Sequence, residues 1–259
     1  MHNNITNIAL AGSGNIAWHL AKVLMLRGYT ISGIWSRDYS KAEELAKSCN
    51  SRAFKEVSGL RETADLLIIA VPDNAIETVA GSIGDFAGIV VHTAGSVTID
   101  VLKEYFEDFG VFYPLQTFSK ATPLVFGEVP LLLEASSLPV MQDLKLLADK
   151  LSGKVFEAVS SQRLMLHIAA VFAGNYSNLM YVIGNELLKE SNLSTEILYP
   201  LILETARKAT SGDPQKLQTG PARRNDSKTI GKHIEALASY PEYAELYRNL
   251  SRIISNNYN

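Results

Sequence analysis

Short apolar segments alternate with amphipathic ones over residues 1–158. The apolar segments are typical of strands buried on both faces of a parallel sheet, and they cover residues 5–11, 29–36, 64–73, 88–95, 111–115, 129–135 and 154–160. Between them, apolar residues recur at helical spacing over residues 15–28, 40–49, 73–86, 98–110 and 138–153. This alternation predicts an α/β fold with a doubly wound, mostly parallel Rossmann-like sheet and right-handed crossovers.

The strand pattern stops near residue 158, and the rest of the chain has a helical pattern. One long, largely apolar helix is predicted at residues 160–191, followed by helices at 194–210, 231–239 and 241–255. We therefore predict a Rossmann-like domain at 1–158 and an all-α domain at 159–259. Because a mostly apolar helix must be covered on nearly every side, we expect a homodimer packed through these helices.

Composition narrows the classes of function. The 259-residue chain is 47% apolar and 20% charged, with a net charge of −3 and a pI near 6.0, which offers no electrostatic attraction for nucleic acid or anionic membranes. It has no apolar run of about eighteen residues and no signal-peptide pattern, so we expect a soluble cytoplasmic protein. The single cysteine, Cys49, and histidines without metal-ligand spacing favour neither an internal disulfide nor a metal site.

A glycine-rich turn carries the first chemical motif. Gly12, Gly14 and Ala17 match the pattern G-x-G-x-x-A directly after the first predicted strand and at the start of a helix. The first glycine permits a tight turn, the second lets the backbone approach a pyrophosphate, and the alanine lets the helix pack against the strand. The free N–H groups of the helix then face the pyrophosphate. The predicted cofactor contacts in this turn are Gly12, Ser13, Gly14, Asn15 and Ile16.

The end of the second strand distinguishes between the two nicotinamide cofactors. NAD-selective sites usually carry an acidic residue there, whereas this strand ends in Ser36 and Arg37. A hydroxyl and a guanidinium suit a 2′-phosphate, so the sequence predicts NADP(H). Asp38 follows and is expected to cap the next helix. In the alternative interpretation, Arg37 is a solvated surface charge.

Two further strand ends are expected to contribute to the same site, because ligands of doubly wound sheets bind at the carboxyl ends of the strands. Val71 and Pro72 lie at the end of the segment 64–73. His92 and Gly95 lie at the end of the segment 88–95 and are expected near the nicotinamide. For His92, a purely structural hydrogen-bonding role is an equal alternative.

Six motifs occur in order along the chain: AGSGNIA, VPDNAI, VVHTAGS, YPLQTF, HIAAVFAGNY and LQTGPARRND, the last followed by His233. Together they resemble a family of two-domain, Rossmann-like NADP oxidoreductases over residues 5–254. In that family the N-terminal part is similar to coenzyme F420-dependent NADP reductases, and the C-terminal helical domain has no known function. The plan is more distantly similar to pyrroline-5-carboxylate reductase, ketopantoate reductase and the β-hydroxyacid dehydrogenases, which bind substrate between their domains. The resemblance implies an NADP-dependent reductase-type fold and supplies no substrate.

Candidate acid–base chemistry lies on the long apolar helix. At about 100° per residue, His167, Val171, Gly174 and Asn178 share one line, and Asn175 lies on an adjoining face. We predict His167 as the proton donor, with Asn175 and Asn178 orienting a carbonyl or imine; a hydrogen-bonded histidine in a helix interface is the alternative. The β-hydroxyacid dehydrogenases carry a catalytic Lys one turn before such an Asn. Matching Asn175 to it places Val171 at the Lys position, so their mechanism does not transfer.

The turn-rich segment TGPARRND at residues 219–226 offers basic donors. Arg223 and Arg224 are predicted to clamp a substrate carboxylate or phosphate, and Arg224 matches the family motif better than Arg223. Thr219 is a further substrate-binding candidate, while Asp226 orients an Arg or caps the following helix. In the alternative, this loop is structural and Arg224 pairs with Asp226. Asn225 stands where the family pattern favours Gly, which puts the geometry of the turn in question. Three further candidates accompany the sixth strand: Tyr113, Gln116 and Thr117.

These observations favour an NADP(H)-dependent oxidoreductase that reduces a carbonyl or imine of a small, anionic metabolite bound between the domains. Two alternatives remain open. One is hydride exchange between NADP and a deazaflavin, which the N-terminal similarity supports. The other is an NADP(H)-binding sensor or scaffold without turnover, which the missing Lys favours.

Overall fold

The computed structural model describes residues 5–62 and 64–258, and the chain forms two compact units that meet between Asn175 and Tyr176. The first unit is thus longer than the Rossmann-like domain of residues 1–158 expected from the sequence. It includes helix α5 (Ser160–Ala170) because a buried side chain of that helix, Arg163, is bonded into the sheet unit. Among the described residues, no helix is both long enough and apolar enough to cross a lipid bilayer.

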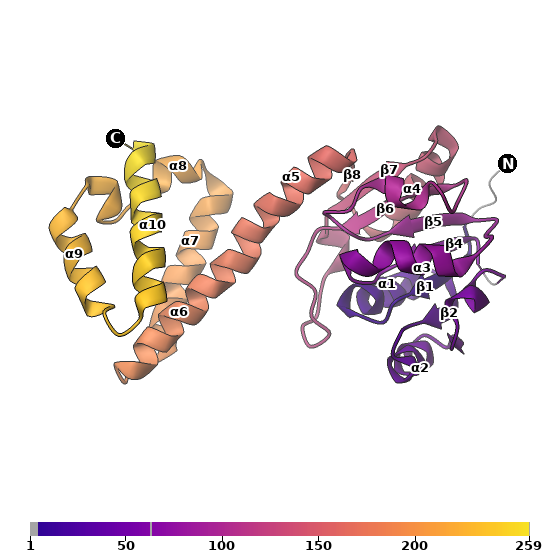
Figure 1. Cartoon of the computed structure of the whole chain (residues 1–259), viewed down its shortest axis with the longest axis horizontal. Helices are drawn as coiled ribbons and strands as arrows, with labels where there is room; N and C mark the ends of the chain where they lie inside the picture. The colour runs from indigo at the N-terminus through magenta and orange to yellow at the C-terminus, as the bar shows by residue number, and fades with distance from the viewer. Residues whose placement is uncertain (1–4, 63, 259) are drawn as a thin grey trace. The chain divides into compact units, whose positions relative to one another are not determined.

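An eight-stranded sheet forms the centre of the first unit, in the order β3-β2-β1-β4-β5-β6-β7-β8 (Figure 1). All neighbouring strands are parallel except β6 and β7, which are antiparallel. The predicted doubly wound, mostly parallel sheet is therefore confirmed. Its strands are β1 (Asn7–Ala11), β2 (Thr30–Trp35), β3 (Ala53–Phe54), β4 (Leu66–Ile69), β5 (Ile89–His92), β6 (Phe109–Pro114), β7 (Leu131–Ala135) and β8 (Val155–Glu157).

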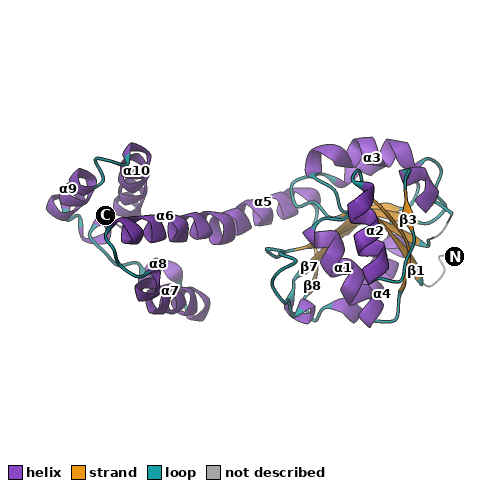
Figure 2. Cartoon of the chain, turned by 90° about the horizontal axis from the view of Figure 1, so that it is seen from below, coloured by secondary structure: helices purple, strands orange, loops and turns teal. Residues whose placement is uncertain are grey.

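Helices cover both faces of the sheet, as the uninterrupted apolar strands require. Ile8 and Leu10 of β1 face one apolar core, and Ala9 and Ala11 face the other, because successive side chains of a strand point to opposite faces. Three helices pack on the first core, and Figure 2 shows them on one side of the sheet: α1 (Asn15–Leu26), α2 (Tyr39–Ser48) and α4 (Leu138–Leu151). Helix α3 (Ile76–Ile83) packs on the second.

The segment 98–110 differs from its prediction. Instead of a full helix it contains one short 3-10 helix, η3 (Ile99–Leu102), and a turn. Before β6 begins at Phe109, only Leu102 and Phe106 of this segment are buried, and they lie four residues apart. A single turn therefore places Leu102 and Phe106 in the core. The acidic residues that follow provide no apolar face that could pack a second helical turn against the sheet.

The long helix predicted at residues 160–191 is present but interrupted. It consists of α5, a π-helical segment at Val171–Tyr176 and α6 (Ser177–Glu190). A π-helix has hydrogen bonds from residue i to i+5 and therefore more residues per turn than an α-helix. The prediction that His167, Gly174 and Asn178 share a line at a constant 100° per residue was consequently wrong beyond Val171.

The second unit consists of helices joined by short turns. Besides α6 it contains α7 (Tyr199–Ser211), the short α8 (Pro214–Leu217), α9 (Ser227–Ala236) and α10 (Pro241–Tyr258). Its internal contacts include a hydrogen bond from Tyr243 of α10 to Glu186 of α6. The side chains of α6 and α7 are not fully buried, and both helices expose large apolar residues such as Val182 and Leu203.

Candidate functional site

The turn after β1 can be formed only by glycine at position 12. Its φ angle is +138°, and a Cβ on Gly12 would lie 2.1 Å from the carbonyl oxygen of Ala70 in the neighbouring strand end. The amide of Gly12 donates to the carbonyl of Trp35 at 2.7 Å, which ties the turn to the end of β2. A side chain at this position would separate β1 from β4, so the turn brings three strand ends together.

The N-terminus of α1 is suited to an anion. Its N-cap is Gly14, no side chain of the described residues caps the helix, and its first turn contains no acidic residue. A Cβ at Gly14 would meet nothing within 4 Å, so the space beside the turn is open. The helix therefore presents unpaired N–H groups and its positive dipole end to this space, as pyrophosphate binding requires.

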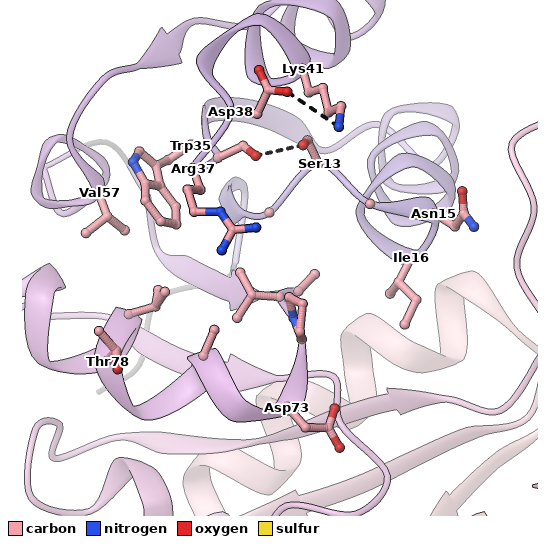
Figure 3. Close-up of a pocket in the computed structure, with 18 of the residues that line it drawn as sticks. Ser13, Asn15, Ile16, Trp35, Arg37, Asp38, Lys41, Val57, Asp73 and Thr78 are labelled. Atoms are coloured by element: carbon pink, nitrogen blue, oxygen red, sulfur yellow. Dashed lines mark hydrogen bonds and ion pairs between the residues drawn. The ribbon is translucent and has the colours of Figure 1, made fainter.

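These features open onto a pocket of about 1070 Å³ at the carboxyl ends of the strands (Figure 3). The structure brings most of the predicted cofactor residues together in its lining. The members of that set are Gly12, Ser13, Gly14, Asn15, Ile16, Ser36, Arg37, Val71 and Pro72. Two further candidates, His92 and Gly95, lie outside the lining.

The glycine turn and the end of β2 together present a hydroxyl pair and a guanidinium to this pocket. Ser13 donates to Ser36 at 2.8 Å, and the Arg37 side chain extends into the pocket in Figure 3. Asp38 is occupied elsewhere, because its carboxylate accepts from the amide of Ser40 at 3.1 Å and caps α2. The hydrogen bond from the Ser40 side chain also holds the pKa of Asp38 below its usual value. The predicted capping role of Asp38 is confirmed. Arg37 supplies a positive charge at the end of β2 that faces the pocket, while Asp38, which also lines it, pairs with Lys41 of α2.

His92 is not part of the pocket lining and is fully buried at the end of β5. Its Nδ1 accepts from the amide of Ala94 at 3.2 Å. Burial lowers the pKa of His92 to about 4, and the neighbouring Arg163 charge acts in the same direction. The imidazole is therefore neutral and accepts a hydrogen bond from the turn that follows its own strand. Both features support the structural alternative for His92 and argue against a proton-donating role near pH 7.

A second group of polar side chains begins where the pocket ends. Asp73 lines the pocket and accepts a hydrogen bond from Ser96, and its charge contributes to raising the pKa of Tyr113. The Tyr113 hydroxyl lies 3.0 Å from Nδ1 of His167, and the two rings meet edge to face. A Cβ on Gly95 would lie 2.7 Å from that Nδ1, so glycine makes room for the pair. The structure thus joins His167 to Tyr113, from β6, beside the pocket.

Arg163 holds the helix that carries His167. Its side chain is 1% exposed, pairs with the carboxylate of Glu134 on β7, and donates to the backbone carbonyls of Ala94 and Val97 after β5. Sequence reasoning missed this residue. The available signal was a lone arginine in an apolar helix, one turn before a candidate histidine. Arg163 therefore connects α5 to two strand ends at once.

Asn175 and the substrate-binding candidates fall in other parts of the chain. Asn175 lies in the π-helical segment at the end of the first unit. Asn178, Thr219 and Arg224 are exposed residues of the second unit. Asp226 accepts from the amide of Thr229 at 3.0 Å and caps α9, which confirms the capping alternative for its carboxylate.

The two arginines of the basic turn before α9 differ in their surroundings. Arg223 lies over the ring of Tyr258, 4.5 Å from its centroid, whereas the Arg224 side chain is exposed. Asn225 adopts a left-handed conformation with φ of 52°, which Asn tolerates better than most non-glycine residues. The Asn in place of the family's Gly is therefore compatible with the turn. Among the described residues, no group of three or more His, Cys, Asp or Glu side chains could hold a metal ion.

Comparison with known proteins places these features in a family. Residues 7–102 match the family model described as NADP oxidoreductase, coenzyme F420-dependent, and residues 129–254 match a domain of unknown function. No curated protein matches the sequence. A crystal structure described as a putative NADP oxidoreductase from Bacteroides fragilis is 40% identical, with a TM-score of 0.92 over 97% of this chain and 98% of that one.

Two more distant structures share the fold. A 1-pyrroline-5-carboxylate reductase from Streptococcus pyogenes is 14% identical, with a TM-score of 0.65 over 98% of this chain and 100% of its own. An imine reductase from Bacillus cereus is 13% identical, with a TM-score of 0.59 over 97% and 92%. At this identity the likeness concerns the fold alone. The Bacteroides fragilis protein and the two matched models show that the chain belongs to the family of two-domain, Rossmann-like NADP oxidoreductases.

Proposed function

We propose that this protein is an NADP(H)-dependent reductase that acts on a carbonyl or imine of a small, anionic metabolite. The observation that carries the proposal is the Tyr113–His167 pair beside the end of the pocket that the glycine turn forms. The pocket offers a dinucleotide site, and the pair offers a proton. The reductases that share the fold support the reaction class, because pyrroline-5-carboxylate contains both an imine and a carboxylate.

The cofactor would lie along the carboxyl ends of the strands. Gly12, Ser13, Gly14, Asn15 and Ile16 would hold the pyrophosphate at the start of α1, and Ser36 and Arg37 would hold the 2′-phosphate. Val71 and Pro72 would line its middle portion. His92 and Gly95 would lie at the nicotinamide end of the cofactor site. His92 would contribute by holding the turn after β5 through its hydrogen bond with the amide of Ala94.

Replacing Arg37 with Asp tests the cofactor assignment. The change should weaken NADPH binding by about 10- to 100-fold, because hydrogen bonds to charged groups contribute about 1.5–3 kcal/mol. NADH has no 2′-phosphate, so its affinity should change by less than about threefold. Titration calorimetry with both nucleotides measures the difference. Arg248→Asp, an exposed position in α10, is the control for the same change in net charge. Equal losses for NADPH and NADH would refute the assignment.

The reaction needs a hydride donor, a proton donor and residues that bind and orient the substrate. When bound, NADPH supplies the hydride. His167 delivers the proton to the oxygen or nitrogen of the reduced bond, and Asn175 and Asn178 orient that bond. We propose Arg224 and Thr219, both exposed in the second unit, as donors to the carboxylate or phosphate of the substrate, while Asp226 holds the turn through its cap on α9.

Incubation of the protein with NADPH and panels of keto acids, aldehydes and cyclic imines tests the proposed function. Oxidation of NADPH with at least one compound, followed at its absorbance band, supports the reductase. Tight NADPH binding without oxidation across the panels would instead favour a sensor. Deazaflavin exchange is the second candidate, because residues 7–102 match a family model described as coenzyme F420-dependent. A further arm with NADP and reduced deazaflavin decides that case.

We also propose that the helices form a homodimer. Apolar side chains of the long helix and of α7 are exposed, among them Phe172 at 64%, Val182 at 42% and Leu203 at 70%. Large apolar side chains exposed along a helix are expected at protein–protein contacts, and a second copy of the chain presents the same apolar helices.

Leu203→Asp tests the dimer. Sedimentation velocity at micromolar concentration should show a dimer for the unmodified protein and a monomer for Leu203→Asp, because the variant places a charge in the apolar contact. Leu26→Asp is the matched control, since Leu26 is an 84% exposed residue of α1 in the first unit. A monomer for the unmodified protein would refute the proposal, and so would loss of the dimer in both variants.

A further inference from the structure

We propose that Tyr113 is a positioning residue that holds His167 in the tautomer with its proton on Nε2, so that Nε2 is the atom that protonates the substrate. Only the last step of this proposal, delivery of the proton, rests on the proposed reductase function. The tautomer can be measured in the protein without any substrate.

The count of donors and acceptors favours the phenol as the donor of the bond. Tyr113 is 7% exposed, and its hydroxyl lies within hydrogen-bond distance of Nδ1 of His167 at 3.0 Å. A phenol has one proton to donate, and a buried hydroxyl that accepted from Nδ1–H would leave that proton in need of another acceptor. Donation from Tyr113 satisfies both groups. Nδ1 is then the acceptor, and the proton of the neutral ring is on Nε2.

The charges around the pair favour a protonated phenol. Burial and the carboxylate of Asp73 raise the pKa of Tyr113, while the guanidinium of Arg163 lowers it. The charges of Arg163 and Asp73 also act on His92, which burial keeps neutral, with a pKa of about 4. Tyr113 therefore keeps its proton at neutral pH and can donate it to Nδ1.

Two features hold the rings in place. Arg163 fixes α5 against the strand ends one turn before His167, so the imidazole is carried by an anchored helix. Gly95 leaves the space that the pair occupies, since a Cβ there would lie 2.7 Å from Nδ1 and 2.9 Å from Cζ of Tyr113. The pair therefore depends on Arg163 of α5 and on Gly95 in the turn after β5.

The proton balance follows from this arrangement. As the hydride reaches the substrate carbon, the proton on Nε2 passes to the oxygen or nitrogen of the same bond. Nδ1 takes the phenol proton in the same step, so the imidazole stays neutral and the negative charge passes to Tyr113. Burial and Asp73 disfavour this phenolate and the guanidinium of Arg163 favours it, so the phenolate is short-lived. Water then returns a proton to Nε2 and leaves hydroxide, while Nδ1 returns its own proton to Tyr113.

The chain contains a matched control pair. In the second unit, His233 Nδ1 lies 2.7 Å from the hydroxyl of Tyr247, and these rings also meet edge to face. His233 is exposed, whereas His167 is partly buried. Tyr247→Phe therefore removes an equivalent hydroxyl–imidazole bond away from the proposed chemistry.

Nitrogen NMR of protein labelled in its histidine rings tests the tautomer. In the unmodified protein, with His167 assigned from the spectrum of His167→Gln, Nδ1 should resonate as an unprotonated nitrogen and Nε2 as a protonated one. In Tyr113→Phe, which keeps the ring, the His167 signals should move toward a mixture of tautomers, and those of His233 should stay unchanged. Tyr247→Phe should produce the opposite pattern.

A protonated Nδ1 in the unmodified protein, or a His167 tautomer unaffected in Tyr113→Phe, would overturn the proposal. The first of these results does not depend on whether a variant folds. With any compound that the NADPH panel identifies, Tyr113→Phe should lower kcat by about 10- to 100-fold with little change in KM, because the effect is on proton delivery. A loss confined to KM would also overturn it. If the tautomer is as expected but no compound is reduced, the proposed reductase function fails while the role of Tyr113 in fixing the tautomer stands.

Discussion

His167→Ala is expected to lower kcat for the reduced substrate by about 10²- to 10⁴-fold, the range by which a positioned general acid accelerates a reaction. The variant removes the imidazole and with it the proposed donor atom Nε2. The Tyr113 hydroxyl also loses Nδ1, the acceptor of its hydrogen bond. The affinity for NADPH should not change, because His167 is not among the residues that line the nucleotide pocket. Steady-state kinetics on a compound found in the NADPH panel, together with calorimetric titration of NADPH, measures both quantities.

His233→Ala is the control for this change. It removes a second tyrosine-bonded imidazole from the same chain and should leave kcat within about twofold of the unmodified enzyme. Full activity of His167→Ala would exclude His167 as the proton donor. Equal losses in the two variants would show that a tyrosine-paired histidine contributes to structure rather than to proton delivery.

Arg163→Met should lower the free energy of unfolding by about 3–5 kcal/mol, because removal of one partner leaves the other charge of a buried ion pair without compensation. Glu134 is only 13% exposed and would lose its guanidinium partner. The carbonyls of Ala94 and Val97 would lose donors in the same change. Urea denaturation followed by circular dichroism measures the difference.

Two comparisons separate the buried charge from a general effect of the substitution. Arg207→Met breaks the exposed Arg207–Glu204 pair on α7 and should leave stability unchanged within error, since exposed pairs contribute little. Arg163→Met combined with Glu134→Leu should recover part of the loss, because the unpaired carboxylate is removed as well. A double variant no more stable than Arg163→Met would show that the ion pair is not the source of the effect.

Much of the first unit could be predicted from the sequence because its signals are local. Gly12 occupies a backbone conformation that other residues rarely adopt, and the continuous apolar strands require helices on both faces of the sheet. The capping role of Asp38 depends on a hydrogen bond to a residue two positions away. In each case the deciding interaction lies within a few residues or follows from a repeated pattern.

The helix predicted at 98–110 and the unbroken helix at 160–191 show the limit of such patterns. Periodicity alone did not show that Leu102 and Phe106 reach the core from a single turn, nor that a π-helical segment shifts the faces after Val171. Both features depend on how the segment meets the rest of the fold, which a local window of sequence does not contain.

By itself, the sequence determined the dinucleotide-binding turn, most strands and helices of the first unit in their order, and the cation at the end of β2, since these depend on backbone conformation and on neighbours close in the chain. Only the tertiary structure decided that Tyr113 meets His167, 54 positions along the chain, and that Arg163 bonds the ends of β5 and β7. Hydrogen bonds between distant segments produce no recognisable pattern of residue spacing in the sequence. The crossover connections of the sheet, rather than the chain order, bring their residues together.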